Sequence, residues 1–219
     1  YTYGTGYSVQ LGTIISPVKQ LRIGLAFQSP TWYKLNDELT QNIYAVSSNI
    51  DGELPADVVD PQVTLIYEPY RVRTAGHMSG SLAYLFGNRG LISFDYIYKN
   101  NDGIKLGPSN DFSVENAYIS SVLRNSSQFR LGGEFKVKKF SFRGGYRFEQ
   151  SPYEDGRTIG DLNGYTGGIG YNFGRIKLDA SYSYTQRFYD QHFFSQGFTD
   201  FAVVNAKTHA ISTSLIFEF

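Results

Sequence analysis

The chain has 219 residues, no cysteine, and 20 basic against 20 acidic side chains. Zero net charge gives no field to hold a nucleic acid, and the missing thiols exclude disulfide scaffolds, thiolate metal sites and thiol catalysis. The aromatic share of 16%, with 23 glycines, is typical of an all-β protein. The sequence contains no apolar run long enough for a transmembrane helix. A mean hydropathy of −0.30 does not exclude a transmembrane β-barrel, because such strands need apolar residues only at alternate positions.

The chain alternates apolar and polar residues almost throughout, which is the period of a β-strand with one apolar face. From Ile176 to Tyr184, for example, the even-numbered residues are apolar or aromatic, and the odd-numbered residues are polar. In chain order the pattern predicts eleven strands, at residues 6–15, 19–28, 31–45, 62–72, 77–86, 91–99, 128–137, 139–149, 164–173, 175–186 and 207–219.

The connections between these strands are of two kinds. Short turns are predicted near residues 16–19, 87–90, 137–139 and 174–175, whereas residues 46–61, 100–127, 150–163 and 187–206 read as long loops. Within the second loop, Asp111–Asn125 has helical spacing and predicts a short surface helix, with Ser113 as a possible N-cap. Short turns on one rim and long loops on the other are typical of an outer-membrane barrel.

The C-terminal strand is the most specific feature. Counted back from Phe219, the residues Phe217 and Leu215 share its face. This pattern resembles the insertion signal that the bacterial outer-membrane assembly machinery reads. The alternative is an edge strand of a soluble sheet, but an unpaired aromatic edge would promote aggregation in water. We therefore favour an antiparallel transmembrane β-barrel over a soluble sheet.

The direction of the strands bears on how the barrel closes. Traced backwards from a periplasmic C-terminus, all short turns fall on the periplasmic rim, and the first of the eleven strands starts outside. Closed barrels of this kind normally have an even number of strands and both termini in the periplasm. We therefore expect that this chain lacks at least one N-terminal strand.

Four stretches resemble FadL/OmpP1-type outer-membrane transport proteins, particularly those of Bacteroidota: Pro17–Pro30, Tyr70–Lys99, Phe129–Tyr153 and Gly164–Tyr184. The resemblance covers most of the chain, but it consists of strand patterns and includes no catalytic signature. It implies a monomeric 14-stranded barrel in the outer membrane of a Gram-negative bacterium, in contact with membrane lipids and lipopolysaccharide. The family's N-terminal hatch, with its Asn-Pro-Ala motif, has no match. Residues 1–219 would thus be a single barrel domain without its N-terminal strands and hatch.

Charged side chains on the polar faces of the strands predict a lumen track. One hypothesis is that the track orients a ligand head group such as a carboxylate. The other, which we favour, is that opposite charges on neighbouring strands satisfy one another. The track comprises Arg130, Glu134, Lys136, Arg143, Arg147, Glu149, Lys177 and Asp179, together with Asp95.

Aromatic residues fall into two groups. Those near strand ends suit interfacial girdles. The others crowd the predicted outer loop 187–206, where they would form a binding surface or simply pack within the loop. The loop residues are Phe188, Tyr189, Phe193, Phe194, Phe198 and Phe201.

The sequence predicts no enzyme, metal site or cofactor. His192 lies close to Asp190, as acid–histidine pairs do in barrel proteases, but one pair in a loop is weak support for a hydrolase. His209 shares the lipid-facing register of Phe219 and suits an interfacial ring. The segment Asn101-Asp102-Gly103 lacks EF-hand spacing and reads as turn chemistry.

Three functions follow, in order of preference. The first is passive transport of hydrophobic small molecules such as long-chain fatty acids. The second is an interaction subunit, since some FadL-like barrels serve protein secretion, with the aromatic loop as a docking surface for a protein partner. The third is the hydrolase.

Overall fold

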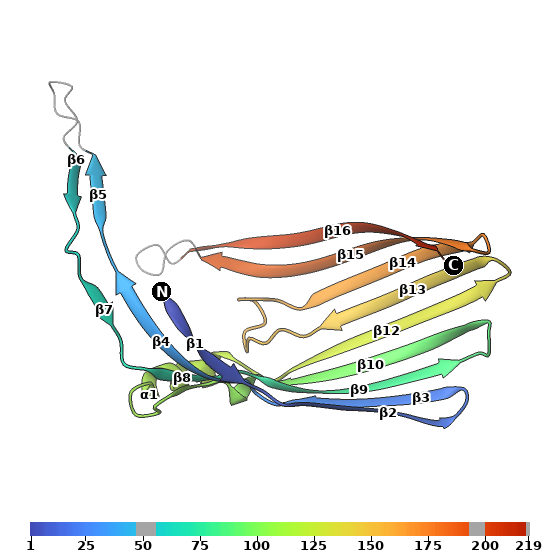
Figure 1. Cartoon of the computed structure of the whole chain (residues 1–219), viewed down its shortest axis with the longest axis horizontal. Coiled ribbons are helices and arrows are strands. Elements are labelled where there is room, and N and C mark those ends of the chain that lie inside the picture. The colour runs from blue at the N-terminus through green and yellow to red at the C-terminus, as the bar shows by residue number, and fades with distance from the viewer. Residues whose placement is uncertain (47–55, 193–199, 218–219) are drawn as a thin grey trace.

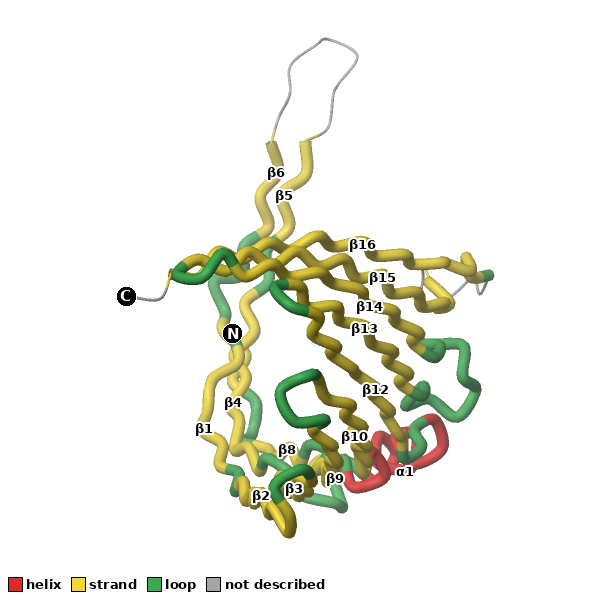
Figure 2. Tube along the Cα trace, turned by 90° about the vertical axis from the view of Figure 1, so that its right-hand side faces the viewer, coloured by secondary structure: helices red, strands yellow, loops and turns green. Residues whose placement is uncertain are grey.

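The computed structural model describes residues 1–46, 56–192 and 200–217, and its main element is a nine-stranded antiparallel sheet. The strands lie in the order β16–β15–β14–β13–β12–β10–β9–β3–β2, and the sheet curls into a trough (Figures 1 and 2). Their bounds are β2 (Gln10–Val18), β3 (Leu21–Gln28), β9 (Gly76–Leu85), β10 (Gly90–Asn100), β12 (Ser126–Val137), β13 (Phe140–Glu149), β14 (Leu162–Asn172), β15 (Ile176–His192) and β16 (Phe201–Phe217). The predicted all-β antiparallel architecture is therefore confirmed.

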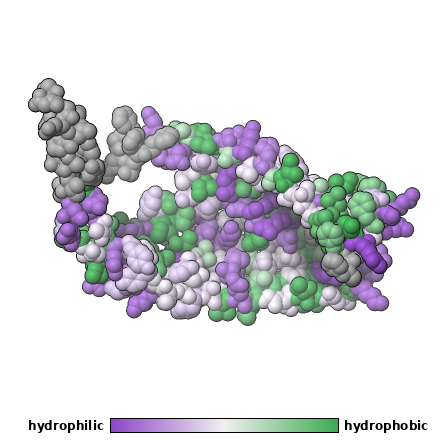
Figure 3. Space-filling model, turned by 45° about the horizontal axis from the view of Figure 1, so that its top comes forward, coloured by the Kyte–Doolittle hydropathy of each residue, from purple (hydrophilic) through white to green (hydrophobic). Residues whose placement is uncertain are grey.

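The sheet has one apolar and one polar face, as the alternation predicts. Among the described residues no apolar side chain is buried. Leu131 on β12 and Ile169 on β14 are instead 48% and 46% exposed on the outer face, which is the arrangement expected where strands face lipid. In the view of Figure 3, both hydrophilic and hydrophobic residues are visible along the strands. No helix among the described residues is long and apolar enough to cross a membrane.

A second sheet extends four of the spanning strands beyond the trough, at the end opposite to the short turns (Figure 1). This outer sheet contains β1 (Thr2–Tyr7), β4 (Trp32–Thr40), β8 (Tyr70–Arg73) and β11 (Lys105–Gly107), with β7 (Thr64–Ile66) paired to β4. Beyond it, β5 (Ile43–Val46) pairs with β6 (Ala56–Val59) as a projecting hairpin.

The prediction of eleven separate crossings is wrong, because the segments 31–45 and 62–72 continue their neighbours and do not turn back. The pair Gln28↔His77 in β3–β9 and the pair Trp32↔Arg73 in β4–β8 obey the same register. The ladder thus runs on past Pro30, which interrupts the regular strand without reversing the chain. Part of the predicted loop 46–61 is likewise strand, and residues 47–55 lie outside the described residues.

The connections follow the predicted two-rim layout. The turns β2–β3, β9–β10, β12–β13 and β14–β15 are short and lie at one end of the sheet (Figure 1). Gly174 adopts a φ of +107° in the last of them, and its N–H donates to the Asn172 side chain at 2.7 Å. The predicted surface helix is confirmed as α1 (Ser113–Val122), after the 3-10 turn η1 (Asn101–Gly103). The N-cap of α1 is Phe112, whose side chain makes no capping hydrogen bond, so the prediction of Ser113 as the N-cap is wrong.

Candidate lumen surface

The predicted lumen track lies on the polar face of β12, β13 and β15. Arg143 is directly opposite Glu134 in the ladder, and its Nε is 3.6 Å from Glu134 Oε2. Lys136 Nζ reaches the same carboxylate at 3.3 Å. Arg143 also donates a hydrogen bond to Asp179 on β15. One guanidinium therefore joins carboxylates from two other strands, so this part of the track is internally paired.

Glycines on the intervening strand allow this long-range pair to form. β14 lies between Arg143 and Asp179, and it places Gly168 beside Arg143 and Gly170 beside Asp179. A Cβ built on Gly170 would overlap the Asp179 carboxylate oxygen and would lie 3.3 Å from its Cγ. The Asp179 side chain thus occupies the space that a larger residue at position 170 would fill.

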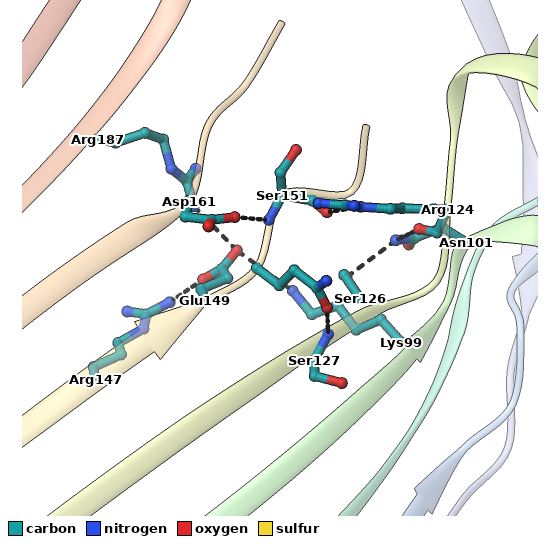
Figure 4. A network of polar contacts seen from close by, with 11 residues as sticks. Lys99, Asn101, Arg124, Ser126, Ser127, Arg147, Glu149, Ser151, Asp161 and Arg187 are labelled. Carbon is teal, nitrogen blue, oxygen red and sulfur yellow. Dashed lines mark hydrogen bonds and ion pairs between the residues drawn. The ribbon is translucent and has the colours of Figure 1, made fainter. Parts of the chain in front are cut away.

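A second charged cluster lies nearer the outer end, around Glu149 (Figure 4). Its carboxylate is 2.6 Å from Arg147 Nη2, 3.3 Å from Arg187 Nη2 and 3.9 Å from Lys99 Nζ. The Glu149 side chain is only 17% exposed. Three cations share one carboxylate here, so this group carries net positive charge.

Gln128, which is 3% exposed, contacts the guanidinium groups of Arg147 and Arg130. With its amide oxygen turned toward them, it accepts from Arg147 Nε at 2.8 Å and from Arg130 Nε at 2.9 Å. The sequence interpretation omitted Lys99, Arg187 and Gln128. The signal was available, since Arg187 and Gln128 each extend the polar alternation of their strands by one step, and Lys99 shares the face of Asp95 on β10.

Buried polar residues anchor the long connections above this cluster (Figure 4). Asn101 Nδ2 donates to Arg124 O at 2.8 Å and to Ser126 Oγ at 3.1 Å. Ser151 is fully buried, and its N–H donates to Asp161 Oδ1 at 2.7 Å. The bonds of Asn101 fix the segment after β10 against the start of β12, and the bond of Ser151 fixes the segment after β13 against the residue before β14.

Between the two charged clusters, the polar face carries only small side chains. They lie directly opposite one another across seven adjacent strands. We call this the small-residue row: Ala83, Ser93, Gly132, Gly145, Thr166, Ser183 and Ala210. Hollows of about 370 and 540 Å³ lie along it.

The remaining track residues lie on the same face. Asp95 is opposite Arg130 in the ladder. Lys177 lines a hollow of about 270 Å³ near the short turns, together with Lys136 and Asp179. The structure thus places all predicted track residues along one surface and joins several of them by ion pairs.

The predicted aromatic loop is mostly strand, because the β15–β16 hairpin continues to His192 and resumes at Phe201. Aromatic and β-branched residues favour strand here over a loop. Phe188 is 50% and Phe201 41% exposed, Tyr189 is half-buried, and the Arg157 guanidinium lies 5.3 Å from the Phe201 ring centroid. Phe193, Phe194 and Phe198 lie outside the described residues.

The acid–histidine pair does not form a catalytic arrangement in the described part of the chain. Asp190 Oδ2 faces Arg157 Nε at 3.4 Å, and the His192 ring packs against Phe201 at 5.4 Å. His209 lies on the lipid-facing side, where its Nδ1 is 2.7 Å from the Tyr182 hydroxyl. Among the described residues no group of three acidic, histidine or cysteine side chains could hold a metal ion.

The C-terminal strand is paired along its whole described length with β15. Phe217 and Leu215 are exposed on the apolar face, at 53% and 54%. Phe219, the last residue of the predicted assembly signal, lies outside the described residues.

The chain matches no known family model and no curated protein sequence. It is similar in structure to OmpT, an outer membrane protein of Vibrio cholerae, with 12% identity and a TM-score of 0.54 over 97% of this chain and 56% of the other. It is also similar to the CymD monoaromatic hydrocarbon channel, with 13% identity and a TM-score of 0.51 over 96% and 50%. The Ralstonia pickettii toluene transporter TbuX aligns at 14% identity and a TM-score of 0.49, over 100% and 55%.

The chain spans about half the length of these solved structures. The similarity concerns the fold, and it agrees with the alternating faces, the two-rim layout and the resemblance to FadL/OmpP1-type proteins. The chain therefore has the fold of an outer-membrane β-barrel of Gram-negative bacteria.

Proposed function

We propose that the protein is a passive outer-membrane channel of the FadL/OmpP1 type for hydrophobic small molecules such as long-chain fatty acids. The observation that carries this proposal is the small-residue row. It crosses seven strands without one long side chain, so it leaves room along the inner wall at mid-height. Diffusion through such a passage needs no chemical group at its wall.

Internal charge pairing beside the row supports a cargo that is mainly hydrocarbon, such as the chain of a fatty acid. Next to the row, Arg143 is neutralised by Glu134 and Asp179. An ion would have to compete with these pairs, whereas an uncharged solute would pass them without penalty. The similarity in fold to a channel described as carrying monoaromatic hydrocarbons points in the same direction.

The two edges of the nine-stranded sheet bear on how the barrel wall closes. β2 and β16 form the two ends of the nine-stranded order, and neither pairs with a further described strand on its other side. Exposed strand edges are not stable in lipid, where every backbone group needs a partner. We propose that residues 1–219 form one barrel domain whose wall is closed at these edges by further strands, to about 14 in all.

The proposal is tested by comparing a bulky substitution on the lumen side of β15 with the same substitution on its lipid-facing side. Ser183→Phe places a ring in the small-residue row, and Ala180→Phe places the same ring on the lipid-facing side of β15. In a strain lacking the native gene, we expect Ser183→Phe to reduce uptake of a radiolabelled long-chain fatty acid at least severalfold. Ala180→Phe should preserve uptake at equal surface expression. Equal uptake by both variants would contradict passage of the fatty acid through the lumen past the small-residue row.

A second candidate function, docking of a protein partner, is favoured by the outer β15–β16 hairpin. Its exposed apolar residues include Phe188, Phe201 and Val203, the last at 63% exposure. We expect Phe188→Ser to abolish co-purification of a partner and to leave uptake unchanged, if docking is the function. If no partner co-purifies with the wild-type protein and Phe188→Ser reduces uptake, the result favours transport.

A further inference from the structure

The outer sheet carries four cations on one face. The ladder forms two adjacent rows of directly opposed residues. The first row contains Tyr7, Trp32, Arg73 and Lys105, and the second contains Thr5, Lys34, Arg71 and Gly107. All four cations are exposed. We call this group, with Tyr7 and Trp32, the outer cation pocket.

The arrangement opposes like charges in two pairs. Lys34 is directly opposite Arg71, and Arg73 is directly opposite Lys105. Directly opposed side chains in a sheet have Cβ atoms about 5 Å apart, and like charges in such pairs are destabilising. In the described part of the chain, none of the four has a salt bridge to an acidic group. In the lumen track, by contrast, Arg143 and Arg147 are each paired with a carboxylate.

The shape of this face is that of a binding pocket. An open hollow of about 430 Å³ is lined by residues of both rows. Trp32 and Tyr7 stack at one side, with ring centroids 5.4 Å apart. Arg71 packs beside Gly107, where a Cβ would lie in ordinary contact with its Nε, at 3.7 Å. The cations thus adjoin an aromatic wall.

The pocket lies on the lumen side of the barrel. Because the register of β3–β9 runs unchanged into β4–β8, residues Arg71 and Arg73 continue the row of alternate positions that contains His77 on the polar face. The outer sheet lies at the end away from the short turns (Figure 1). A ligand held by these cations would therefore sit at the outer mouth of the passage.

We propose that the outer cation pocket binds the dianionic phosphate group of an organic phosphate monoester, with its organic part against Trp32 and Tyr7. Four cations without a salt bridge to an acidic group are better matched by two negative charges than by the single charge of a carboxylate. Arginine forks match phosphate oxygens in bidentate geometry, and lysines add point charges. The proposal holds whether or not hydrophobic molecules are the cargo.

Trp32 makes the site directly observable, since it is the only tryptophan among the 219 residues. The purified full-length protein in phosphatidylcholine vesicles is titrated with phenyl phosphate, benzoate and phenol while tryptophan fluorescence is recorded. A Trp32→Phe variant identifies the signal that belongs to this residue. We expect a saturable change with phenyl phosphate, binding about tenfold weaker for benzoate, and none for phenol. Added salt should weaken the binding.

Two vesicle compositions distinguish the sources of the phosphate group. If the natural ligand is a soluble ester, phenyl phosphate acts equally in vesicles with and without phosphatidic acid. If it is a lipid head group, phosphatidic acid alone changes the Trp32 signal and blocks phenyl phosphate. Both outcomes support the pocket.

Matched charge variants decide the proposal. Arg71→Gln/Arg73→Gln should weaken phenyl phosphate binding at least about tenfold. It should also raise the midpoint of thermal unfolding of the unligated protein, because two like-charge pairs disappear. Lys19→Gln/Lys139→Gln removes two exposed cations at the short turns and should leave both quantities unchanged. Phosphate binding that is absent in the wild type, equal for phenol, or unaffected by Arg71→Gln/Arg73→Gln would overturn the proposal.

Discussion

Replacing Gly170 with alanine tests the ion pair that crosses β14. The new methyl group would overlap the Asp179 carboxylate, so that side chain must swing away and release Arg143. A charge-assisted hydrogen bond contributes about 1.5–3 kcal/mol, and we reduce this to about 1–2 kcal/mol because the Arg143 side chain is 42% exposed. Alanine offsets about 0.5–1 kcal/mol of the loss by restricting the unfolded chain. The net result is a free energy of unfolding about 0.5–1 kcal/mol lower.

The assay is urea unfolding of the protein in lipid vesicles, followed by tryptophan fluorescence. Gly167→Ala is the matched control, because Gly167 lies on the same strand with no atom near its missing Cβ, and it should stabilise by up to about 1 kcal/mol. In an Asp179→Ala background, Gly170→Ala should no longer lower the free energy of unfolding and should stabilise the protein as Gly167→Ala does. A Gly170→Ala variant that is as stable as Gly167→Ala, or that costs the same with and without Asp179, would refute the reasoning.

Further predictions concern the faces, a loop and a buried anchor. Ile169→Lys, on the lipid face, should lower the free energy of unfolding in vesicles by about 2–4 kcal/mol, whereas Thr166→Lys should be tolerated; equal effects would contradict the assigned faces. Backbone hydrogen bonds from Arg157 and Thr158 lower the pKa of Asp155 in its loop. These bonds should therefore hold the loop fully ordered above the usual aspartate pKa. The order should be lost as the pH falls through the lowered pKa. Amide exchange at Thr158 measures this loss, and Asp155→Asn should abolish its pH dependence. Asn101→Ala should cost about 1–3 kcal/mol in urea unfolding, because buried acceptors lose their donor.

The face of each spanning strand was predictable from the sequence. A period of two leaves only one way to put Leu178 in lipid and Asp179 in the lumen, so the lipid-facing and lumen-facing residues of β12 to β16 followed from the alternation. Pairing of opposite charges on neighbouring strands was anticipated, and the pair of Arg143 with Glu134 is an example. Its bond to Asp179 was not, because the pair spans an entire strand and depends on glycines whose partners the sequence does not name.

The strand ends were less predictable, because alternation alone does not say where the membrane stops. The predicted turn-back after Pro30 is wrong, since Trp32 keeps the register of β3 and the chain runs on into the outer sheet. The aromatic segment around Phe188 similarly continues β15, where a loop was expected. The outer cation pocket escaped prediction for the same reason: Lys34, Arg71 and Lys105 come together only once these segments are recognised as extensions of neighbouring strands.

The central claim is that β15 is part of a barrel wall with lipid on one side and an aqueous lumen on the other. The chain has no cysteine, so single-cysteine variants along residues 177–184 can be labelled in intact outer membranes with a water-soluble maleimide. We expect labelling with period two: strong at positions 181 and 183, weak at 180 and 182. Uniform labelling, or labelling in the opposite phase, would contradict it.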